Sequence, residues 1–224
     1  GCVAGFFKAI AELKPERLRA VAEIGLAANG IGLDSLATDE SVVSHAGKRI
    51  RIGNADATGA LFLADLLSHL RVCAQDAVAP KILSVATSAG KGLYSTSLDN
   101  APAMRARSSS GLATVGDLWG EPVEVVRLRR EDFWELRPRS CAEDAIVCNG
   151  KPSTMSDRAA QSAMAFLSVV SGLDGHGRDA AKPICFTHVE LAGSVADGAD
   201  CQRVRPADAP VTTFAARWIL SDSL

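Results

Sequence analysis

Short apolar runs alternate with longer helix-like segments along the chain, and this alternation constrains the possible folds more than any other feature. The runs 81–87 and 184–191 are short and apolar, as buried strands usually are. The predicted strands span residues 18–28, 48–52, 81–87 and 184–191, with two shorter strands near 92–101. The predicted helices span residues 2–14, 60–75, 104–118, 130–136 and 157–172, and a last helix begins near 209–210. This order predicts an α/β fold whose mainly parallel sheet is flanked by helices on both faces.

Length and composition are those of an ordinary globular domain. The 224 residues suffice to bury a substantial core, and we expect them to form a single domain over 1–224. The net charge of -2 implies no strong attraction to nucleic acid or to an anionic membrane. No apolar run approaches the length of a membrane span. We therefore expect neither nucleic acid nor a membrane as a partner.

The cysteines are scattered along the chain without metal-binding spacing. The six positions are Cys2, Cys73, Cys141, Cys148, Cys185 and Cys201. The lack of a C-x-x-C pair argues against a zinc knuckle. Cys73 and Cys185 lie in apolar stretches, which predicts small buried hydrophobic residues. We expect a reducing intracellular compartment, cytoplasmic or mitochondrial matrix, although an even number of cysteines leaves disulfides open.

Residues 137–156 follow no regular pattern and include two prolines and the pair Asn149-Gly150. We interpret this stretch as a loop. A long loop beside an active site often carries function. Asp157, directly after it, is predicted to cap the helix that follows.

The segment Asn54–Ala60 lies between a predicted strand and the apolar start of a predicted helix. It resembles the N-T-D-A-E-G-R-L signature of the leucyl aminopeptidase family. In that family the Asp and Glu of the motif bind two catalytic metal ions, and the Arg helps to stabilise the transition state. Asp56 occupies the Asp position of this motif. Thr58 stands at the Glu position and Ala60 at the Arg position.

Further blocks resemble the catalytic domain of the same family and occur in the same order. Val3–Phe7 is similar to its V-A-G-F-L helix, and Ser44–Ile50 to its S-x-x-G-K-x-I turn and strand. Residues 187–194 are similar to its H-x-D-I-A-G strand. Because several blocks agree in order and spacing, the chain is identified as a member of the family.

One more block concerns the substrate cleft. Ala86–Gly90 stands where the family has A-T-L-T-G, a backbone segment that lines the cleft. The resemblance therefore implies that Thr87, Ser88 and Gly90 line a substrate cleft. The block departs from the family pattern because the second Thr is absent.

The substitutions in the motif predict a defective metal site. A two-metal peptidase needs several anionic oxygens around its cations to generate a nucleophile from water. The neutral hydroxyl of Thr58 is a shorter and weaker ligand than a Glu carboxylate, and Ala60 supplies no cation. Asp56 is either a live metal ligand or a vestigial residue that caps the following turn or is simply inherited, and the loss of its Glu partner favours the vestigial interpretation. No cofactor is expected, whereas an active protein would use zinc or manganese.

In the family, the remaining ligands are a Lys and two Asp, with a further catalytic Lys, and all lie upstream of the V-A-G-F helix. The resemblance therefore implies that the domain is incomplete on its N-terminal side. The helix at 2–14 and the strands at 18–28 and 81–87 would then expose apolar faces and open edges. We expect another polypeptide to cover the surface around Gly1–Ile10.

The remaining polar features are assigned structural roles. The histidines, which are His45, His69, His176 and His188, lack metal-binding spacing and are interpreted as structural or surface residues. His188 is expected to be a hydrogen-bonded packing residue of its strand. The run Arg127–Asp132 mixes both signs of charge without an aromatic stacking platform. It favours a solvated helix start or an ion-pair face over nucleic-acid binding.

Two functions are compatible with these patterns. The first is a catalytically inactive relative of leucyl aminopeptidase that serves as a structural or scaffolding subunit of a larger assembly. The second is a metal-dependent aminopeptidase that releases N-terminal residues from peptides, with missing ligands supplied by an upstream segment or another chain. Family members form hexamers of two stacked trimers, so the resemblance implies a homo- or hetero-oligomer.

Overall fold

The computed structural model describes residues 1–27, 30, 32–55, 59–87, 95–99, 109–147, 158–191, 196–197, 205–206 and 210–220. The helices are α1 (Cys2–Leu13), α2 (Gly59–Ala74), α3 (Ser109–Trp119), α4 (Ala159–Val170) and α5 (Val211–Trp218). The strands are β1 (Ser41–Val43), β2 (Arg49–Ile52), β3 (Lys81–Ala86), β4 (Ser95–Asp99), β5 (Val123–Val125), β6 (Ala145–Val147), β7 (Cys185–Glu190), β8 (Ala196–Asp197) and β9 (Arg205–Pro206). Two short 3-10 helices are η2 (Arg130–Phe133) and η4 (Leu173–His176).

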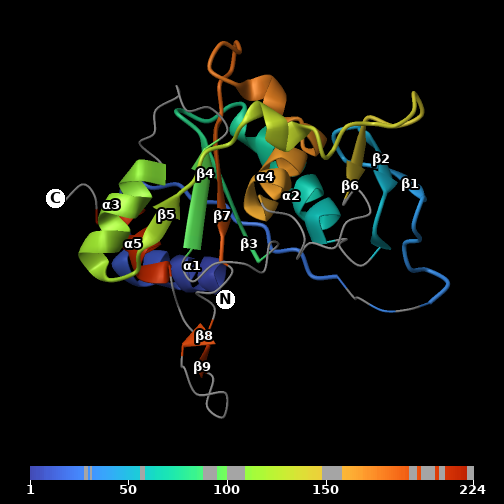
Figure 1. Cartoon of the computed structure of the whole chain (residues 1–224). Coiled ribbons are helices and arrows are strands. Elements are labelled where there is room, and N and C mark those ends of the chain that lie inside the picture. Colours follow the sequence, from blue (N-terminus) through green and yellow to red (C-terminus); the bar gives the residue numbers. More distant parts are fainter. Residues whose placement is uncertain are drawn as a thin grey trace.

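The central sheet has the strand order β3-β7-β4-β5 (Figure 1). The β3–β7 and β4–β5 pairs are parallel, whereas β4 and β7 are antiparallel. The sheet is therefore mixed, with two of its three pairings parallel, and the predicted α/β fold is confirmed. The run at 81–87 suits a central parallel strand by its apolar composition, but it forms β3 at an edge of the described sheet. β7 and β4 take the inner places.

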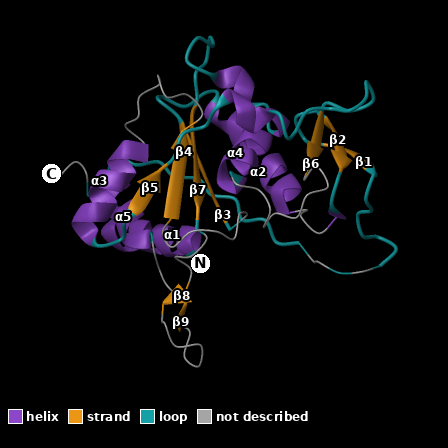
Figure 2. Cartoon of the chain, viewed as in Figure 1, coloured by secondary structure: helices purple, strands orange, loops and turns teal. Residues whose placement is uncertain are grey.

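Both faces of this sheet are covered by helices, as Figure 2 shows. Alternate residues of β3 point to opposite faces, as in any strand. Ile82 belongs to a large hydrophobic cluster with α2 and α4. Leu83 and Val85 pack against a smaller cluster formed by α1, α3 and α5. The predicted flanking of the sheet by helices on both faces is therefore confirmed.

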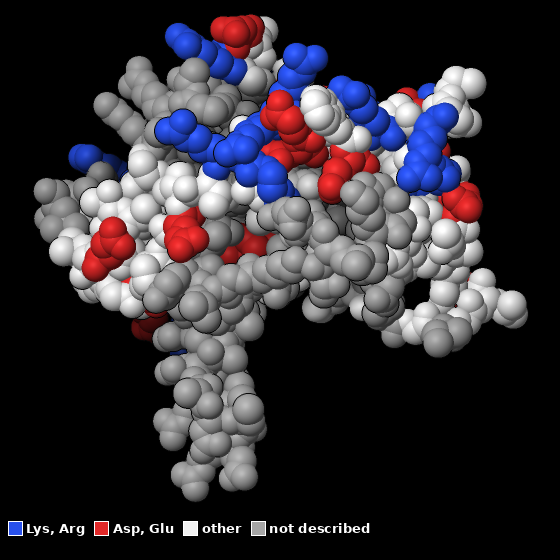
Figure 3. All heavy atoms as spheres, viewed as in Figure 1, with Lys and Arg blue, Asp and Glu red and all other residues white. Residues whose placement is uncertain are grey.

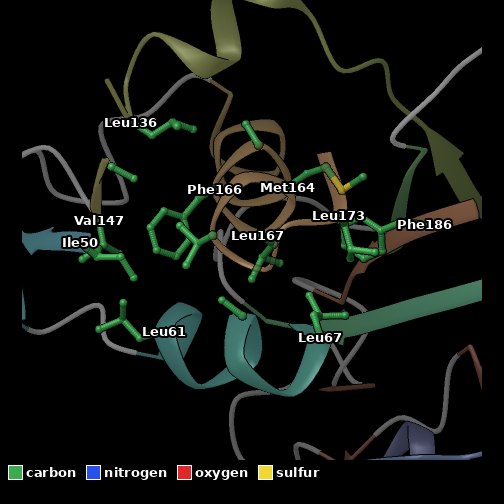
Figure 4. Packing of buried hydrophobic residues seen from close by; sticks show 14 of the residues in the cluster. Ile50, Leu61, Leu67, Leu136, Val147, Met164, Phe166, Leu167, Leu173 and Phe186 are labelled. Atoms are coloured by element: carbon green, nitrogen blue, oxygen red, sulfur yellow. The ribbon is translucent and has the colours of Figure 1, made fainter. Parts of the chain in front are cut away.

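Helix α4 lies at the centre of the larger cluster (Figure 4). Phe166 points towards Ile50 and Val147, which belong to β2 and β6. Leu167 and Met164, on the side of Phe186 of β7, are fully buried. One apolar helix thus packs against both the central sheet and the strands beyond it, which fixes their relative position.

A second sheet has the order β1-β2-β6. β1 and β2 form an antiparallel hairpin around the predicted turn at His45–Gly47, where Gly47 adopts a positive φ of 78°. β6 pairs with β2 in parallel. The interpretation of 137–156 as a loop is therefore wrong at residues 145–147, which form a buried strand. A three-residue strand is too short to show a periodic pattern, and β1 escaped prediction for the same reason.

The predicted buried strand at 18–28 is also wrong. Residues 18–27 form no strand, and the side chains of Val21, Ile24 and Leu26 are 60%, 59% and 92% exposed. An apolar composition indicates burial, but a strand also needs a neighbour with which to pair its backbone. The segment instead runs beside α2, where Glu23 contacts His69.

The other predicted elements agree with the structure where it describes them. The helices predicted over 2–14, 60–75 and 157–172 correspond to α1, α2 and α4, and the last helix to α5. The short helix expected over 130–136 is the 3-10 helix η2. Helix α3 matches the prediction over 104–118 from Ser109 onward, and residues 104–108 and Asp157 lie outside the described residues. None of the described helices is long and apolar enough to cross a membrane.

The structure shows no disulfide among the cysteines that it describes, which are Cys2, Cys73, Cys141 and Cys185. The prediction that Cys73 is buried is wrong, since it lies on the exposed side of α2, and Cys185 is only partly buried. Burial raises the pKa of the Cys2 thiol to about 11. This thiol is therefore protonated and unreactive near neutral pH.

Candidate functional site

The segment that resembles the metal-binding motif connects β2 to α2. β2 ends at Ile52, and the next residue, Gly53, donates its backbone N–H to the carbonyl of Val147 at 2.9 Å. Because β2 and β6 are parallel, the chain leaves both strands at the same edge of this sheet. Such an edge is where α/β proteins usually place functional loops.

The structure describes only part of the motif itself. Asp56 and Thr58 lie outside the described residues, so the metal prediction for Asp56 stays a prediction. Ala60 lies in the first turn of α2, and its side chain is partly buried against the larger hydrophobic cluster. Within the described residues of the first turn there is no acidic side chain, and Gly59–Phe62 holds no cation either. The start of α2 thus supplies packing and no charge.

The predicted cleft segment follows β3. Leu191, directly after β7, donates its backbone N–H to Ala86 at 2.8 Å, so the carboxyl ends of the parallel strands β3 and β7 lie side by side. Thr87 follows β3 at this edge and is exposed, as a cleft residue would be. Ser88 and Gly90 lie outside the described residues.

A row of buried polar side chains crosses from β3 to β7. Ser84 and His188 are register partners, and their Oγ and Nδ1 atoms lie 2.8 Å apart. His188 Nε2 lies 3.5 Å from Glu190 Oε2, two residues farther along the same face. All three residues are at most 2% exposed. Sequence reasoning missed Ser84 and Glu190, although polar residues at register positions inside two apolar runs are a usable signal.

This serine–histidine–carboxylate row has the residue types of a nucleophilic triad, but it is closed to solvent. The nucleophile of such a triad must meet a substrate carbonyl. The hydroxyl of Ser84 belongs to a residue that is 2% exposed and lies within the sheet–helix interface. The row is therefore structural, and the prediction that His188 is a hydrogen-bonded packing residue is confirmed.

The other histidines also have local structural partners. His45 Nδ1 lies 3.0 Å from Ser68 Oγ, and its backbone N–H donates to Asp65. His176 Nδ1 donates to the carbonyl of Lys182 at 2.9 Å. Among the residues that the structure describes, no group of three or more His, Cys, Asp or Glu side chains is placed to hold a metal ion.

The order of these blocks agrees with a comparison against known families. The profile of the cytosol aminopeptidase family, catalytic domain, matches residues 1–219. The chain belongs to the cytosol aminopeptidase family. The prediction of a leucyl aminopeptidase relationship is thereby confirmed, since the match covers almost all of the chain.

Two curated relatives show how much of a family protein the chain spans. It is 36% identical over 201 residues to "Putative aminopeptidase W07G4.4" of Caenorhabditis elegans, which covers 87% of this chain and 38% of the relative. It is 32% identical over 136 residues to "Probable cytosol aminopeptidase" of Aquifex aeolicus (strain VF5), covering 58% of this chain and 27% of the relative. The chain thus spans well under half the length of these relatives.

A solved structure supports the fold. A mutant of tomato leucine aminopeptidase superposes with a TM-score of 0.69 at 20% sequence identity. The superposition covers 98% of this chain and 40% of the tomato chain. At this identity the likeness establishes the fold and leaves the activity to be argued from the site itself.

Proposed function

We propose that this chain is a catalytically inactive member of its family that acts as a structural or scaffolding subunit of a larger assembly. One observation carries the proposal. The two positions at which the motif supplies a metal-binding carboxylate and a catalytic cation hold Thr58 and Ala60. The chain as a whole superposes on a leucine aminopeptidase structure with a TM-score of 0.69, which supports a fold that is maintained without the charges of the site.

The donor set that remains does not fit a pair of divalent cations. Hard cations take six or more oxygen ligands, usually with several carboxylates. Asp56 is the one carboxylate in the motif, and a Thr hydroxyl does not offset a second positive charge. Ala60 packs its methyl group against the hydrophobic cluster, in the place where the family motif has a guanidinium. The metal and the transition state would therefore both lose their main electrostatic support.

The alternative is a metal-dependent aminopeptidase that removes N-terminal residues from peptides. In that case zinc or manganese would be held by ligands from an upstream segment or from another chain. Thr58 and Ala60 count against this alternative. They lie inside the motif of this chain, so an upstream segment or another chain would not change them. Removing one electrostatic group of this kind typically costs on the order of 10²–10³ in rate.

The deciding experiment is hydrolysis of a leucine anilide by the purified full-length protein with added zinc or manganese. We expect no metal-dependent turnover above that of a metal-only blank. A family enzyme with the intact motif serves as the positive control in the same assay. Turnover within about tenfold of that enzyme would overturn the proposal in favour of the alternative.

Metal analysis gives a second, independent readout. After dialysis we expect less than one equivalent of zinc or manganese per chain, because a single motif carboxylate binds weakly. Two retained equivalents would mean that other ligands complete the site. The variant Asp56→Asn is the matched control, since it should lower the metal content only if Asp56 is a ligand.

The proposed assembly role draws on the surface of the molecule. No residue of α1 is fully buried, although Cys2 and Phe6 pack against the smaller cluster, and Leu13, Val21 and Leu26 are more than half exposed. We infer that another polypeptide covers the region around Gly1–Ile10. A stable contact there would bury well over ~1,000 Å². The free thiols are compatible with a reducing compartment, which we propose to be the cytoplasm or the mitochondrial matrix.

A further inference from the structure

Four exposed arginines gather around the 3-10 helix η2, and we name them the arginine face. They are Arg127, Arg129, Arg130 and Arg137. Within the described part of the chain, none of these four guanidinium groups forms an ion pair with a carboxylate. Figure 3 shows Lys and Arg side chains along the upper side of the molecule, where this segment lies in Figure 1. Asp and Glu side chains lie between them in the same view, so the arginine face is a local excess of positive charge on a protein whose net charge is -2.

The acidic residues of the same stretch do not neutralise this face. Asp132 is 3% exposed and accepts hydrogen bonds from Nε and Nη2 of Arg158 at 2.5 and 2.9 Å. Glu135 is half-buried and accepts a hydrogen bond from the Ser162 hydroxyl of α4 at 3.1 Å. Only Glu131 is exposed among the three acids of the stretch. With Asp132 balanced by Arg158, four positive charges face the two negative charges of Glu131 and Glu135, which leaves a local excess of two.

The segment that carries the arginines is held in one shape. The carboxylate of Asp132 also accepts the backbone N–H of Arg129 at 2.6 Å, which closes the first turn of η2. Leu128 and Phe133 pack against the larger hydrophobic cluster. Because the backbone is anchored on both sides of the turn, binding of a ligand would cost little conformational entropy of this segment.

The end of the face carries an aromatic ring. Trp134 is 50% exposed, and the guanidinium of Arg137 lies 5.4 Å from its ring centre. This distance is within the range of a cation–π contact between the two side chains. Arg and Trp are both enriched among the residues that contribute most to protein–protein binding.

We propose that the arginine face binds an acidic polypeptide segment of a partner protein. Guanidinium groups bind carboxylates through two parallel hydrogen bonds, and four of them on one anchored segment suit a run of Asp or Glu side chains. The inference goes beyond the proposed scaffold role and is independent of whether the protein hydrolyses peptides.

A single-stranded nucleic acid fits the face less well. Such ligands stack successive bases on several aromatic rings along a positive groove. Here one ring is present, and Arg137 already occupies part of it. The overall net charge of -2 also opposes a polyanion that extends beyond the arginine face.

The test is fluorescence anisotropy of a labelled oligoglutamate peptide added to the full chain at low salt. A Gly-Ser peptide of equal length and a labelled oligothymidine are the comparison ligands. We expect oligoglutamate to bind more tightly than both, and the binding to weaken at least tenfold between about 50 and about 300 mM salt. No binding of oligoglutamate at low salt would overturn the proposal, as would tighter binding of oligothymidine.

Variants locate the binding. Arg127→Gln/Arg129→Gln/Arg130→Gln should weaken oligoglutamate binding at least tenfold. The control Lys8→Gln/Lys14→Gln/Arg19→Gln makes the same charge change away from η2 and should bind as the unmodified protein does. An equal loss in both variants would mean attraction by net charge alone and would refute the assignment to this face. The single variant Arg137→Gln gives a second check, because it should also weaken binding and leave the anchoring of η2 intact.

Discussion

At the scale of single residues, we expect the ion pair of Arg158 and Asp132 to contribute strongly to the stability of the fold. The Asp132 side chain is 1% exposed and that of Arg158 is 31% exposed. Burial alone would raise the pKa of Asp132, but hydrogen bonds from Arg158 and from the backbone of Arg129 outweigh it and hold this pKa below its ordinary value. The pair therefore fastens η2 to the start of α4 with an ionised carboxylate.

The variant Arg158→Ala should lower the free energy of unfolding by about 2–3 kcal/mol near neutral pH, because it leaves a buried carboxylate without its cation. The matched control is Lys182→Ala, which removes the exposed contact to Asp76 and should change stability by at most about 0.5 kcal/mol. Urea unfolding of both variants measures the difference.

The sign of the pH dependence follows from the lowered pKa of Asp132. A carboxylate whose pKa is depressed on folding stabilises the protein above its unfolded pKa, and this contribution is lost as the pH falls through the folded pKa. The difference in the free energy of unfolding between Arg158→Ala and the unmodified protein should therefore be largest near pH 6. It should become smaller below about pH 4. A difference that stays constant down to acid pH would contradict a stabilising role for the ionised Asp132 carboxylate.

At the scale of elements, the sheet β1-β2-β6 depends on charged contacts because its strands are so short. Arg49 of β2 bonds Asp144, next to β6, through both its side chain and its backbone N–H, with a shortest side-chain contact of 2.9 Å. These bonds lower the pKa of Asp144 to about 2. The pKa of Glu143 is also lowered, first by the backbone N–H of Arg139 and then by Arg51. Both carboxylates remain ionised in the folded sheet at ordinary pH.

We predict that acid opens this sheet before the central one. Asp144 contributes stability above its ordinary pKa near 3.8, and that stability is lost as the pH falls towards about 2. Amide exchange at 50–52 and 145–147, corrected for the intrinsic rate, should accelerate at acid pH earlier than exchange at 186–189. The variant Arg49→Gln should show the acceleration already at pH 6, and Arg19→Gln, an exposed arginine outside the strands, should not. Equal acceleration in both sheets would refute the prediction.

At the scale of the whole molecule, the distribution of apolar surface is unusual. α1 packs on α5 through edge-to-face contacts of Phe6 with Phe214 and Trp218 at 6.1 and 6.0 Å. Leu13 at its end is 53% exposed, and the extended segment that follows exposes Val21, Ile24 and Leu26. Several exposed apolar side chains within so short a stretch favour a contact with another chain.

We therefore expect residues 1–224 in isolation to associate, seen as a concentration-dependent sedimentation coefficient. The variant Val21→Ser/Ile24→Ser/Leu26→Ser should reduce the association. Val78→Ser, which alters a residue that is 98% exposed in a turn, serves as control and should not. A monomer with one cooperative thermal transition would mean that the chain forms a self-sufficient single domain, and it would remove the main support for an assembly role.

The sequence by itself determined the family, the α/β fold class and the positions of the long elements. Apolar periodicity over ten or more residues identifies helices such as α1, α2 and α4. The order of the sequence blocks that resemble the family can be read without a structure. The sequence also identified the substitutions at positions 58 and 60, on which the proposed function depends. These features are local in the chain, so a local pattern suffices to predict them.

Only the tertiary structure decided features that depend on partners distant in sequence. Residues 145–147 form β6 because their backbone pairs with β2. Residues 18–27 pair with no strand among the described residues, and they form none themselves. The run Arg127–Asp132 carries charges of both signs in sequence. In the structure Asp132 is buried and bonds Arg158, 26 residues farther along the chain, whereas the arginines of the run are exposed. Strand pairing and charge neutralisation are contacts through space, and their energies are set by which groups the fold brings within hydrogen-bonding distance.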